Sequence, residues 1–201
     1  MIAIICMLID HMGFVLFDNA YWMRAIGRIA FPIFCFLIVE GFHHTKSPMH
    51  YLLRLCIFAL ISEVPFDLAF WHAPFVWTHQ NVFFTLALGL ASLFCLEEMN
   101  TKRIYVIPLV AIWAAAYFIH CDYGLGGVLL IGMFYLTEEM PWFRALLAAL
   151  ILYLFYNVVE LYGLIALIPI TFYNGKRGPK TKMFFYWFYP VHLLILFLII
   201  K

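Results

Sequence analysis

Apolar runs follow one another along almost the whole of this chain, separated by short stretches that contain charged residues, glycine or proline. Of its 201 residues, 67% are hydrophobic and 11% are charged, whereas a soluble domain has roughly half apolar and a quarter charged residues. No globular core can bury that much apolar surface, so the sequence predicts an all-α, polytopic bundle of membrane helices in one domain, residues 1–201. About nine spans are expected, with eight or ten also compatible, over segments 2–17, 25–43, 51–70, 80–96, 104–119, 123–137, 142–157, 160–173 and 184–200.

The loops between these segments alternate in charge. Lysine and arginine gather in every second loop, around Lys46, Lys102, Arg144 and Lys176, whereas the other loops, such as WHAPFVWTHQ at 71–80, are nearly free of them. Cytoplasmic loops of membrane proteins carry the excess of basic residues. The pattern therefore predicts a cytoplasmic N-terminus and a C-terminus on the opposite side of the membrane.

Ionisable side chains occur inside several of the predicted spans. A charged group within the hydrocarbon region is costly, so such residues are by default candidates for function. Glu63 and Asp67 are four residues apart, hence on one face of their helix, with Pro65 between them. The candidates in the spans are Asp10, His11, Arg28, Glu40, Glu63, Asp67 and His192.

Each candidate also has a purely structural interpretation. Arg28 paired with a carboxylate would fix helix packing, and Glu40, Arg54 and Asp67 would reach water if they lie at the membrane interfaces. Histidines at the ends of the predicted segments are interpreted as solvated side chains, namely His43, His44, His50, His72, His79 and His120. The residues alone leave these alternatives open.

His11 is the candidate best suited to acid–base chemistry. A histidine in a partly dry site can act as a general base, because its ordinary pKa lies near neutrality. Asp10 would orient its ring, although neighbouring residues on a helix point about 100° apart, and Arg28 would stabilise an oxyanion or hold a phosphate. No serine or cysteine lies in a nucleophile-elbow sequence, which favours direct, base-assisted transfer over a covalent intermediate.

The most basic loop runs from Tyr173 to Lys182 and reads YNGKRGPKTK. Its glycines would let backbone amides approach an anion, and its lysine and arginine side chains would supply charge for a nucleotide-like polyphosphate. The alternative is a loop that determines topology and contacts anionic lipid. Charge alone does not decide between the two.

Six motifs occur in order over nearly the whole chain: IAIICMLIDHMG at 2–13, RAIGRIAFPIFCFLIVEGFHHT at 24–45, RLCIFALISEVPFDL at 54–68, NVFFTLALG at 81–89, YNGKRG at 173–178 and FYWFYPVHLLIL at 185–196. Together they resemble the TraX family of membrane proteins, which is named for the acetylase of conjugative pilin subunits. That family is similar in turn to a wider group of transmembrane acyltransferases, which includes a lysosomal heparan N-acetyltransferase.

The resemblance implies a multi-pass protein of the bacterial inner or cytoplasmic membrane that takes an acyl group from cytosolic acyl-CoA, with acetyl-CoA as the expected donor and no metal. The acceptor would be an amine or hydroxyl on the extracytoplasmic side, in a pilin-like protein N-terminus or an envelope glycan. A homodimer is possible, since the sequence does not disclose the oligomeric state, and nucleic acid is not an expected partner.

The resemblance also implies roles for individual residues. His11 would be the general base, with Asp10 as its partner and Arg28 as the third catalytic residue. The coenzyme would be bound by Tyr173, Asn174, Gly175, Lys176, Arg177 and Arg54. The substrates would be contacted by Glu40, Glu63, Asp67, Asn81, Tyr189 and His192.

Two other classes of function remain compatible with the residues. Buried Asp, Glu, His and Arg also form the relays of a proton-coupled small-molecule transporter. Inverted repeats or paired broken helices would favour a transporter, and the sequence shows no convincing repeat. A non-enzymatic assembly factor for an envelope structure is the third class, in which the charges serve only helix association.

Overall fold

The computed structural model describes residues 1–176 and 182–201, and these residues are helical, with one isolated bridge between Gln80 and Cys121 and no strand. This confirms the all-α prediction. The elements are α1 Ile2–Val15, α2 Tyr21–Gly27, α3 Ala30–His44, α4 Pro48–Trp71, α5 Val82–Met99, η1 Arg103–Tyr105, α6 Val106–Phe118, α7 Gly124–Leu136, α8 Pro141–Phe155, η2 Val158–Ala166, α9 Leu167–Thr171 and α10 Lys182–Ile200.

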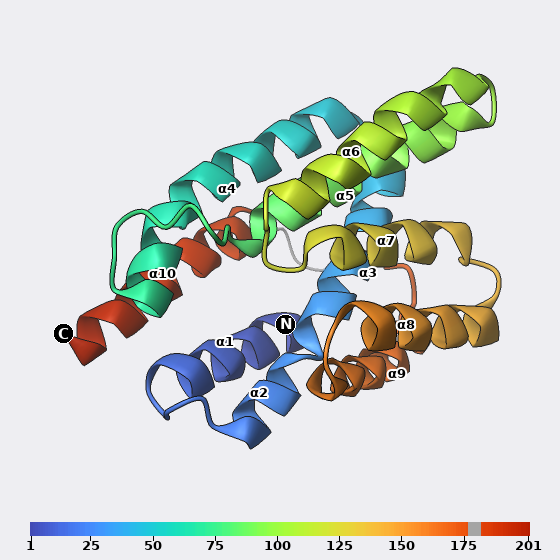
Figure 1. Ribbon diagram of the computed structural model, residues 1–201. Helices are drawn as coiled ribbons and strands as arrows, with labels where there is room; N and C mark the ends of the chain where they lie inside the picture. The colour runs from blue at the N-terminus through green and yellow to red at the C-terminus, as the bar shows by residue number, and fades with distance from the viewer. Residues whose placement is uncertain (177–181) are drawn as a thin grey trace.

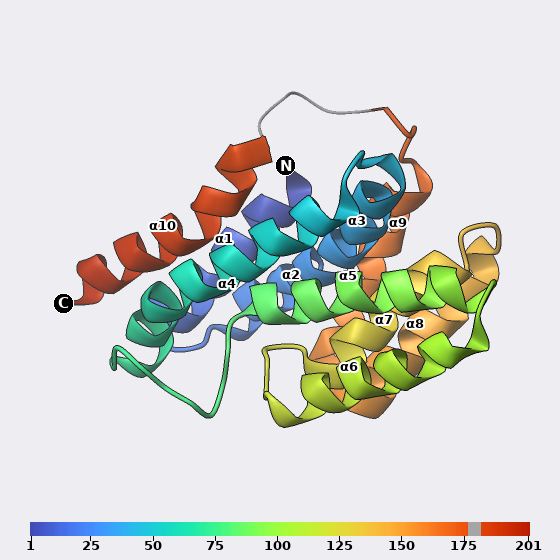
Figure 2. The ribbon, with the colours of Figure 1, turned by 90° about the horizontal axis from the view of Figure 1, so that it is seen from above.

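Neighbouring helices run in alternating directions, so their connections gather at two ends of the bundle (Figures 1 and 2). One end, which we call the Asp122 end, contains the turns after α1, α4, α6 and α8 and the C-terminus. The other, the Lys176 end, contains the turns after α3, α5 and α7 and the end of α9. The basic loops thus lie at one end and the nearly neutral loops at the other, as the predicted alternation requires. Which end faces the cytoplasm stays a prediction.

Three helical stretches of the described residues are long and apolar enough to cross a membrane, judged by length and composition: Tyr21–His44, Val82–Met99 and Met183–Ile200. Each predicted segment overlaps a helix or two consecutive helices. The number of spans stays a prediction. The segment expected over 160–173 is not a regular α-helix, because η2 winds as a 3-10 helix before α9 follows it.

The long stretch Tyr21–His44 is interrupted between α2 and α3. Pro32 has no N–H to donate to the Arg28 carbonyl, so the helical hydrogen-bond ladder is broken at this point. A methyl group added to Gly163 of η2 would lie only 3.1 Å from the Arg28 carbonyl oxygen. The absence of a side chain at Gly163 therefore lets η2 lie directly against the junction at which Arg28 stands.

Helices α5 and α7 form the centre of the bundle and contact each other. Helix α5 also contacts α3, α4 and α6, and α7 also contacts α3, α6 and α8. Leu90 and Leu93 of α5 and Val128 and Ile131 of α7 are fully buried. A methyl group at Gly89 would overlap the Ile131 side chain. Close packing around small residues is the main attraction between helices in lipid, so this contact fixes the frame that holds the outer helices.

Candidate functional site

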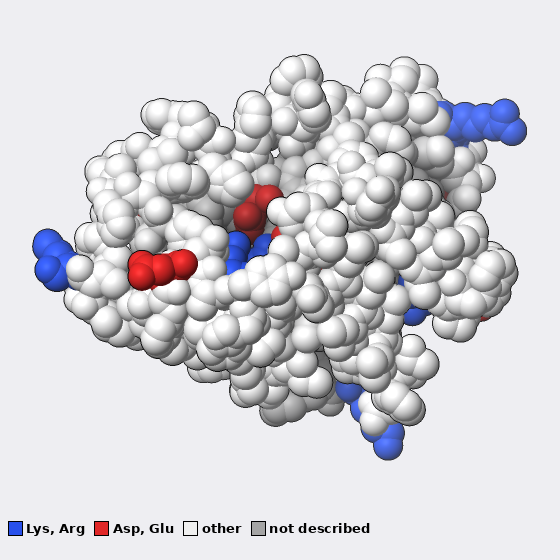
Figure 3. Space-filling model, turned by 60° about the horizontal axis from the view of Figure 1, so that its bottom comes forward, with Lys and Arg blue, Asp and Glu red and all other residues white. Residues whose placement is uncertain are grey.

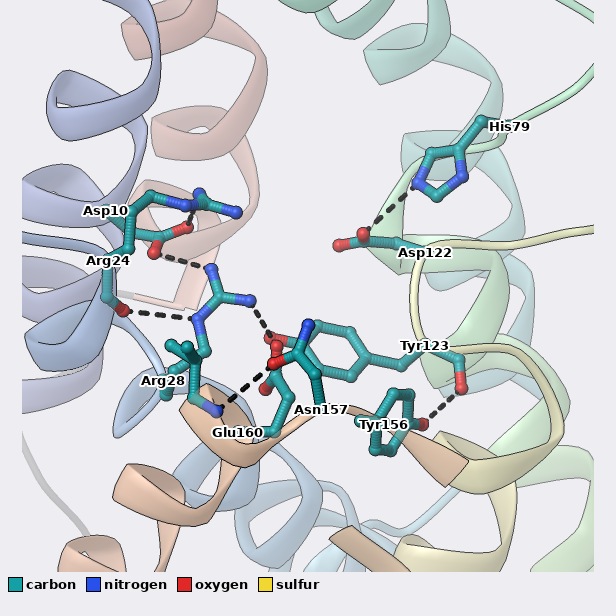
Figure 4. Close-up of polar contacts among 10 residues, drawn as sticks. Asp10, Arg24, Arg28, His79, Asp122, Tyr123, Tyr156, Asn157 and Glu160 are labelled. Atoms are coloured by element: carbon teal, nitrogen blue, oxygen red, sulfur yellow. Dashed lines mark hydrogen bonds and ion pairs between the residues drawn. The ribbon is translucent and has the colours of Figure 1, made fainter. Parts of the chain in front are cut away.

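Arg28 lies at the centre of a buried network of charges at the Asp122 end (Figure 4). Its Nη2 donates to Asp10 Oδ1 at 2.5 Å and its Nη1 donates to Glu160 Oε1 at 2.6 Å. Arg24 Nη1 donates to Asp10 Oδ2 at 2.7 Å. The side chains of Arg28, Asp10 and Glu160 are only 11%, 8% and 11% exposed. Two carboxylates and two guanidiniums thus neutralise one another inside the bundle, which is how charges within a membrane are tolerated.

Glycines bring α1 and α2 close enough for these contacts. A methyl group at Gly27 would overlap the Asp10 carboxylate, and one at Gly13 would overlap the Met23 side chain. Tight helix crossings in membranes depend on such small residues. The sequence therefore encodes a close α1–α2 hairpin in which the carboxylate of Asp10 meets the guanidinium of Arg28.

A cavity of ≈ 240 Å³ lies beside the charge network. Figure 3 shows acidic and basic atoms at the floor of a hollow whose rim is formed by uncharged residues. The acidic, basic and histidine residues that line the cavity are Asp10, His11, Arg24, Arg28, His79 and Asp122, and most of the remaining lining is aromatic or aliphatic. A concave, mainly apolar site with a few convergent polar groups is the usual form of a small-molecule site.

His11 contacts His192 and not Asp10. The His11 Nδ1 atom lies 2.6 Å from His192 Nε2, and His192 Nδ1 lies 2.6 Å from the Phe188 carbonyl oxygen. The prediction that Asp10 is the partner of His11 is therefore wrong, because the Asp10 carboxylate binds the two arginines. Adjacent residues of a helix point about 100° apart, so Asp10 faces α2 while His11 faces α10.

Helix α10 supplies a second neighbour of His11, besides His192. Tyr189 lies edge-on to the His11 ring, with the ring centroids 5.8 Å apart, and it lines the cavity. Tyr189 and His192 are both buried, at 3% and 5% exposure. The structure thus brings these two predicted residues of the last helix to the predicted catalytic histidine.

The structure places Glu63, Asp67 and Asn81 at the connection between α4 and α5, and none of the three lines the cavity. The side-chain amide of Asn81, which caps α5, donates to Glu63. Asp67 Oδ2 accepts the Val76 N–H at 2.7 Å. These contacts fasten the loop at 72–81 to α4, which explains why polar side chains are buried there, and the predicted role of the three residues in substrate binding stays a prediction.

His79 and Asp122 line the cavity across from Arg28 (Figure 4). His79 Nε2 lies 3.3 Å from Asp122 Oδ1, and the backbone N–H of Asp122 donates to the Gln80 carbonyl at 2.9 Å. The hydrogen bond with Asp122 raises the pKa of His79 above its ordinary value, although partial burial acts in the opposite direction. His79 is therefore not the freely solvated side chain that the sequence predicts.

The predicted coenzyme loop lies at the Lys176 end. The Asn174 side chain accepts the Lys176 N–H at 3.0 Å, and Gly175 has a φ of 68°, so the chain turns sharply there. None of the residues 173–176 lines the cavity. Arg177, the remaining predicted residue of this loop, lies outside the described residues.

Arg54 and Glu40 also lie toward the Lys176 end and do not line the cavity. The Arg54 guanidinium is 5.6 Å from the centre of the Tyr51 ring, and Glu40 Oε2 is 3.9 Å from His44 Nδ1. The structure therefore gathers the predicted catalytic residues in one place and leaves the predicted coenzyme residues, together with Glu40, in a separate region.

Sequence reasoning misses Arg24, Glu160, His79 and Asp122 as parts of the site. Arg24 directly precedes one predicted span and Glu160 is the first residue of another, so the pattern places both at the ends of apolar runs and not inside the bundle. Arg28 needs a counter-charge inside the bundle, and that need is the one signal that could have indicated Glu160. The pairing of His79 with Asp122 joins two loops that are distant in the chain, so no local sequence pattern indicates it.

These observations define the class of protein: an all-helical membrane protein whose helices enclose a small cavity lined by paired charges and a buried histidine. Within the part of the chain that the structure describes, no three His, Cys, Asp or Glu side chains are grouped so that they could hold a metal ion. The family model described as TraX protein matches residues 1–200. The chain belongs to the TraX family.

Two relatives illustrate the range of the similarity. The chain is 30% identical to a "Probable fimbrial assembly protein FimC" of Dichelobacter nodosus, in a match that covers 97% of this chain and 91% of that protein. It is 27% identical to "Protein TraX" of Escherichia coli, over 75% of this chain and 60% of that protein. No solved structure matches the chain significantly.

Proposed function

We propose that this protein is a membrane acyltransferase that moves an acetyl or other acyl group from cytosolic acyl-CoA to an amine or hydroxyl on the extracytoplasmic side. The observation that carries the proposal is the position of His11. It is a buried histidine in a cavity at the Asp122 end, next to two guanidiniums and in contact with a second histidine. A general base beside a source of positive charge for the oxyanion is what base-assisted transfer from a thioester requires.

In the proposed reaction, His11 takes the proton of the acceptor amine or hydroxyl as the acceptor attacks the thioester carbon. The carbon–sulfur bond then breaks, and the coenzyme thiolate leaves and is protonated by His11. The developing oxyanion needs a donor that faces the cavity. Arg24 suits this role better than Arg28, because Arg24 makes one side-chain ion pair with Asp10, whereas Arg28 is held by both Asp10 and Glu160.

The donor is proposed to bind at the Lys176 end. Tyr173–Lys176 and Arg54 supply backbone amides and positive charge suited to the phosphates of the coenzyme. The hydrocarbon core is about 30 Å thick, so the pantetheine arm would need to reach roughly half of that depth to bring the thioester to His11. The described cavity does not extend to this region, and transfer therefore requires a path that opens when the donor binds.

The acceptor is proposed to enter at the Asp122 end, which the charge of the loops assigns to the extracytoplasmic side. The relative from Dichelobacter nodosus is named as a fimbrial assembly protein. A pilin-like protein N-terminus is accordingly the first acceptor to test, and an envelope glycan is the second. Only the acyl group needs to cross the membrane in this scheme.

A direct test uses the purified protein in detergent with acetyl-CoA and a peptide that carries a pilin-like N-terminus as the acceptor, and follows both binding of acetyl-CoA and release of the free coenzyme thiol on transfer to the peptide. His11→Gln should bind acetyl-CoA like the wild type and release the thiol roughly 10²- to 10⁴-fold more slowly, because the general base is lost. His50→Gln, at an exposed position, is the matched control and should behave like the wild type. Equal rates for His11→Gln and the wild type would remove the catalytic assignment.

A non-enzymatic assembly role is the second candidate, and the printed name of the fimbrial relative favours it. In that case the charges at the Asp122 end would serve only helix packing. Cells that carry His11→Gln separate the two roles. Full assembly of envelope fibres in these cells, at wild-type protein levels, would support the assembly role and count against catalysis by His11.

A further inference from the structure

The contact between His11 and His192 assigns a role to α10, and this role rests on the proposed function of His11 as the base. We propose that His192 is a positioning residue that holds the hydrogen of His11 on Nδ1, so that Nε2 keeps the free lone pair. A base needs its lone pair on the nitrogen that faces the acceptor. The hydrogen bond made by one ring nitrogen decides which nitrogen that is.

The Phe188 carbonyl is the starting point of the argument. A carbonyl oxygen accepts hydrogen bonds and cannot donate them, so His192 Nδ1, which lies 2.6 Å from it, carries a hydrogen. In a neutral imidazole the other nitrogen then has no hydrogen, which makes His192 Nε2 an acceptor. His11 Nδ1 lies 2.6 Å from that acceptor and therefore donates. The hydrogen of neutral His11 is on Nδ1, and Nε2 is its basic nitrogen.

Burial supports the neutral state of both rings. His11 is 8% exposed and His192 is 5% exposed, and a buried charge without a partner is far more costly than a buried neutral ring. Among the described residues, carboxylates contact other histidines but neither of these two. The nearby carboxylate of Asp10 is already bound by two guanidiniums.

The relative orientation of the rings fits a hydrogen bond and not a stacking contact. Their planes are 3° apart and their centroids are 4.9 Å apart. Rings stacked face to face cannot bring two nitrogens to 2.6 Å, so the bond lies edge to edge in the shared plane, along the lone pair of His192 Nε2. The Phe188 ring, with its centroid 4.8 Å from that of His192, supports the second ring.

The hydrogen position on His11 is measurable by ¹⁵N NMR of the full-length protein labelled with ¹⁵N-histidine, because protonated and bare ring nitrogens resonate far apart. The His11 signals are those that disappear in His11→Gln. The wild type should show a protonated Nδ1 and a bare Nε2. A protonated Nε2 would overturn the inference, and this result does not depend on whether the protein transfers acyl groups.

Two substitutions separate positioning from packing. In His192→Gln the side-chain oxygen can replace Nε2 as acceptor, whereas His192→Phe keeps a ring and removes the acceptor. His192→Phe should lose the Nδ1-protonated signal of His11 and lower kcat by roughly 10²- to 10⁴-fold, with KM for acetyl-CoA nearly unchanged. His192→Gln should keep the signal and retain kcat within about tenfold of the wild type.

Equal losses of kcat in the two variants, with the His11 signal unchanged in both, would assign His192 to packing and overturn the inference. Thermal unfolding of each variant checks that the fold is intact. If His192→Phe does not fold, the wild-type spectrum and the spectrum of His192→Gln still decide the position of the hydrogen. Absence of transfer in the wild type, with Nδ1 protonated, would contradict the proposed function and leave the positioning intact.

Discussion

The two ends of the bundle hold their charges in different ways. At the Asp122 end, Arg28 is buried and paired with Asp10 and Glu160. At the Lys176 end, charged side chains lie at the surface, as in the pair between His43 and Glu138, whose side chains are 36% and 44% exposed. A charge inside a membrane requires a partner, whereas a charge at the interface can be solvated. The charges at the centre of the Asp122 end are thus held in fixed positions by their partners, whereas those of the His43–Glu138 pair are accessible to water.

Arg28→Ala should lower the free energy of unfolding more than any other variant proposed here, and it tests the buried charges at the Asp122 end. The variant leaves Asp10 with Arg24 alone and Glu160 without a counter-charge, and breaking a buried pair costs about 3–5 kcal/mol. We expect a loss of that size in the free energy of unfolding, measured by denaturant titration in detergent. Arg103→Ala, at an exposed position of the Lys176 end, should change the free energy of unfolding by less than about 0.5 kcal/mol. Similar small losses in both variants would contradict the buried network.

Gly27→Ala should have the next largest effect, because the added methyl group would overlap the Asp10 carboxylate. Overpacking of this kind costs about 1–3 kcal/mol, and the α1–α2 hairpin should open slightly. Gly132→Ala is the matched control, since its methyl group would meet only Leu96 Cδ1 at 3.5 Å and alanine favours a helix by up to about 1 kcal/mol. Unfolding measurements in which both variants behave alike would count against the close approach of α1 and α2.

Asn81→Ala should destabilise the protein by about 1–2 kcal/mol, since it removes the cap of α5 and the hydrogen bond to Glu63. Asn157→Ala removes an exposed cap from η2 and should cost roughly half as much or less. Hydrogen exchange of the amides at 72–81 is the second measurement. Faster exchange there is expected in Asn81→Ala, and unchanged exchange would show that this residue does not fasten the loop.

Asp122→Asn, which disrupts the pair of His79 and Asp122, should have the smallest effect on the free energy of unfolding. Folding raises the pKa of His79, so its stabilisation is fully present below the ordinary value of about 6.5 and is lost as the pH rises through the raised value. The side chains are 35% and 34% exposed, and a pair so screened contributes less than about 1 kcal/mol. The difference in free energy of unfolding between wild type and Asp122→Asn should therefore shrink at high pH. A difference that stays constant with pH would contradict this pairing.

The sequence predicts which charges lie inside the bundle better than it predicts their partners. Asp10, His11 and Arg28 stand in apolar runs, and the structure does bring them to one cavity. The partners Glu160 and His192 are more than a hundred residues away along the chain. Helix periodicity carries no information on which distant helix a side chain faces, so these contacts become visible only in the folded chain.

The most direct test of the central claim follows transfer of a labelled acetyl group. Wild-type protein in proteoliposomes would receive acetyl-CoA labelled in the acetyl group, together with envelope proteins and glycans from cells that lack this protein. We expect the label in a protein or glycan acceptor with the wild type and with His50→Gln, and none with His11→Gln. Labelling by His11→Gln at the wild-type rate, or no labelling by the wild type, would contradict acyl transfer at the cavity.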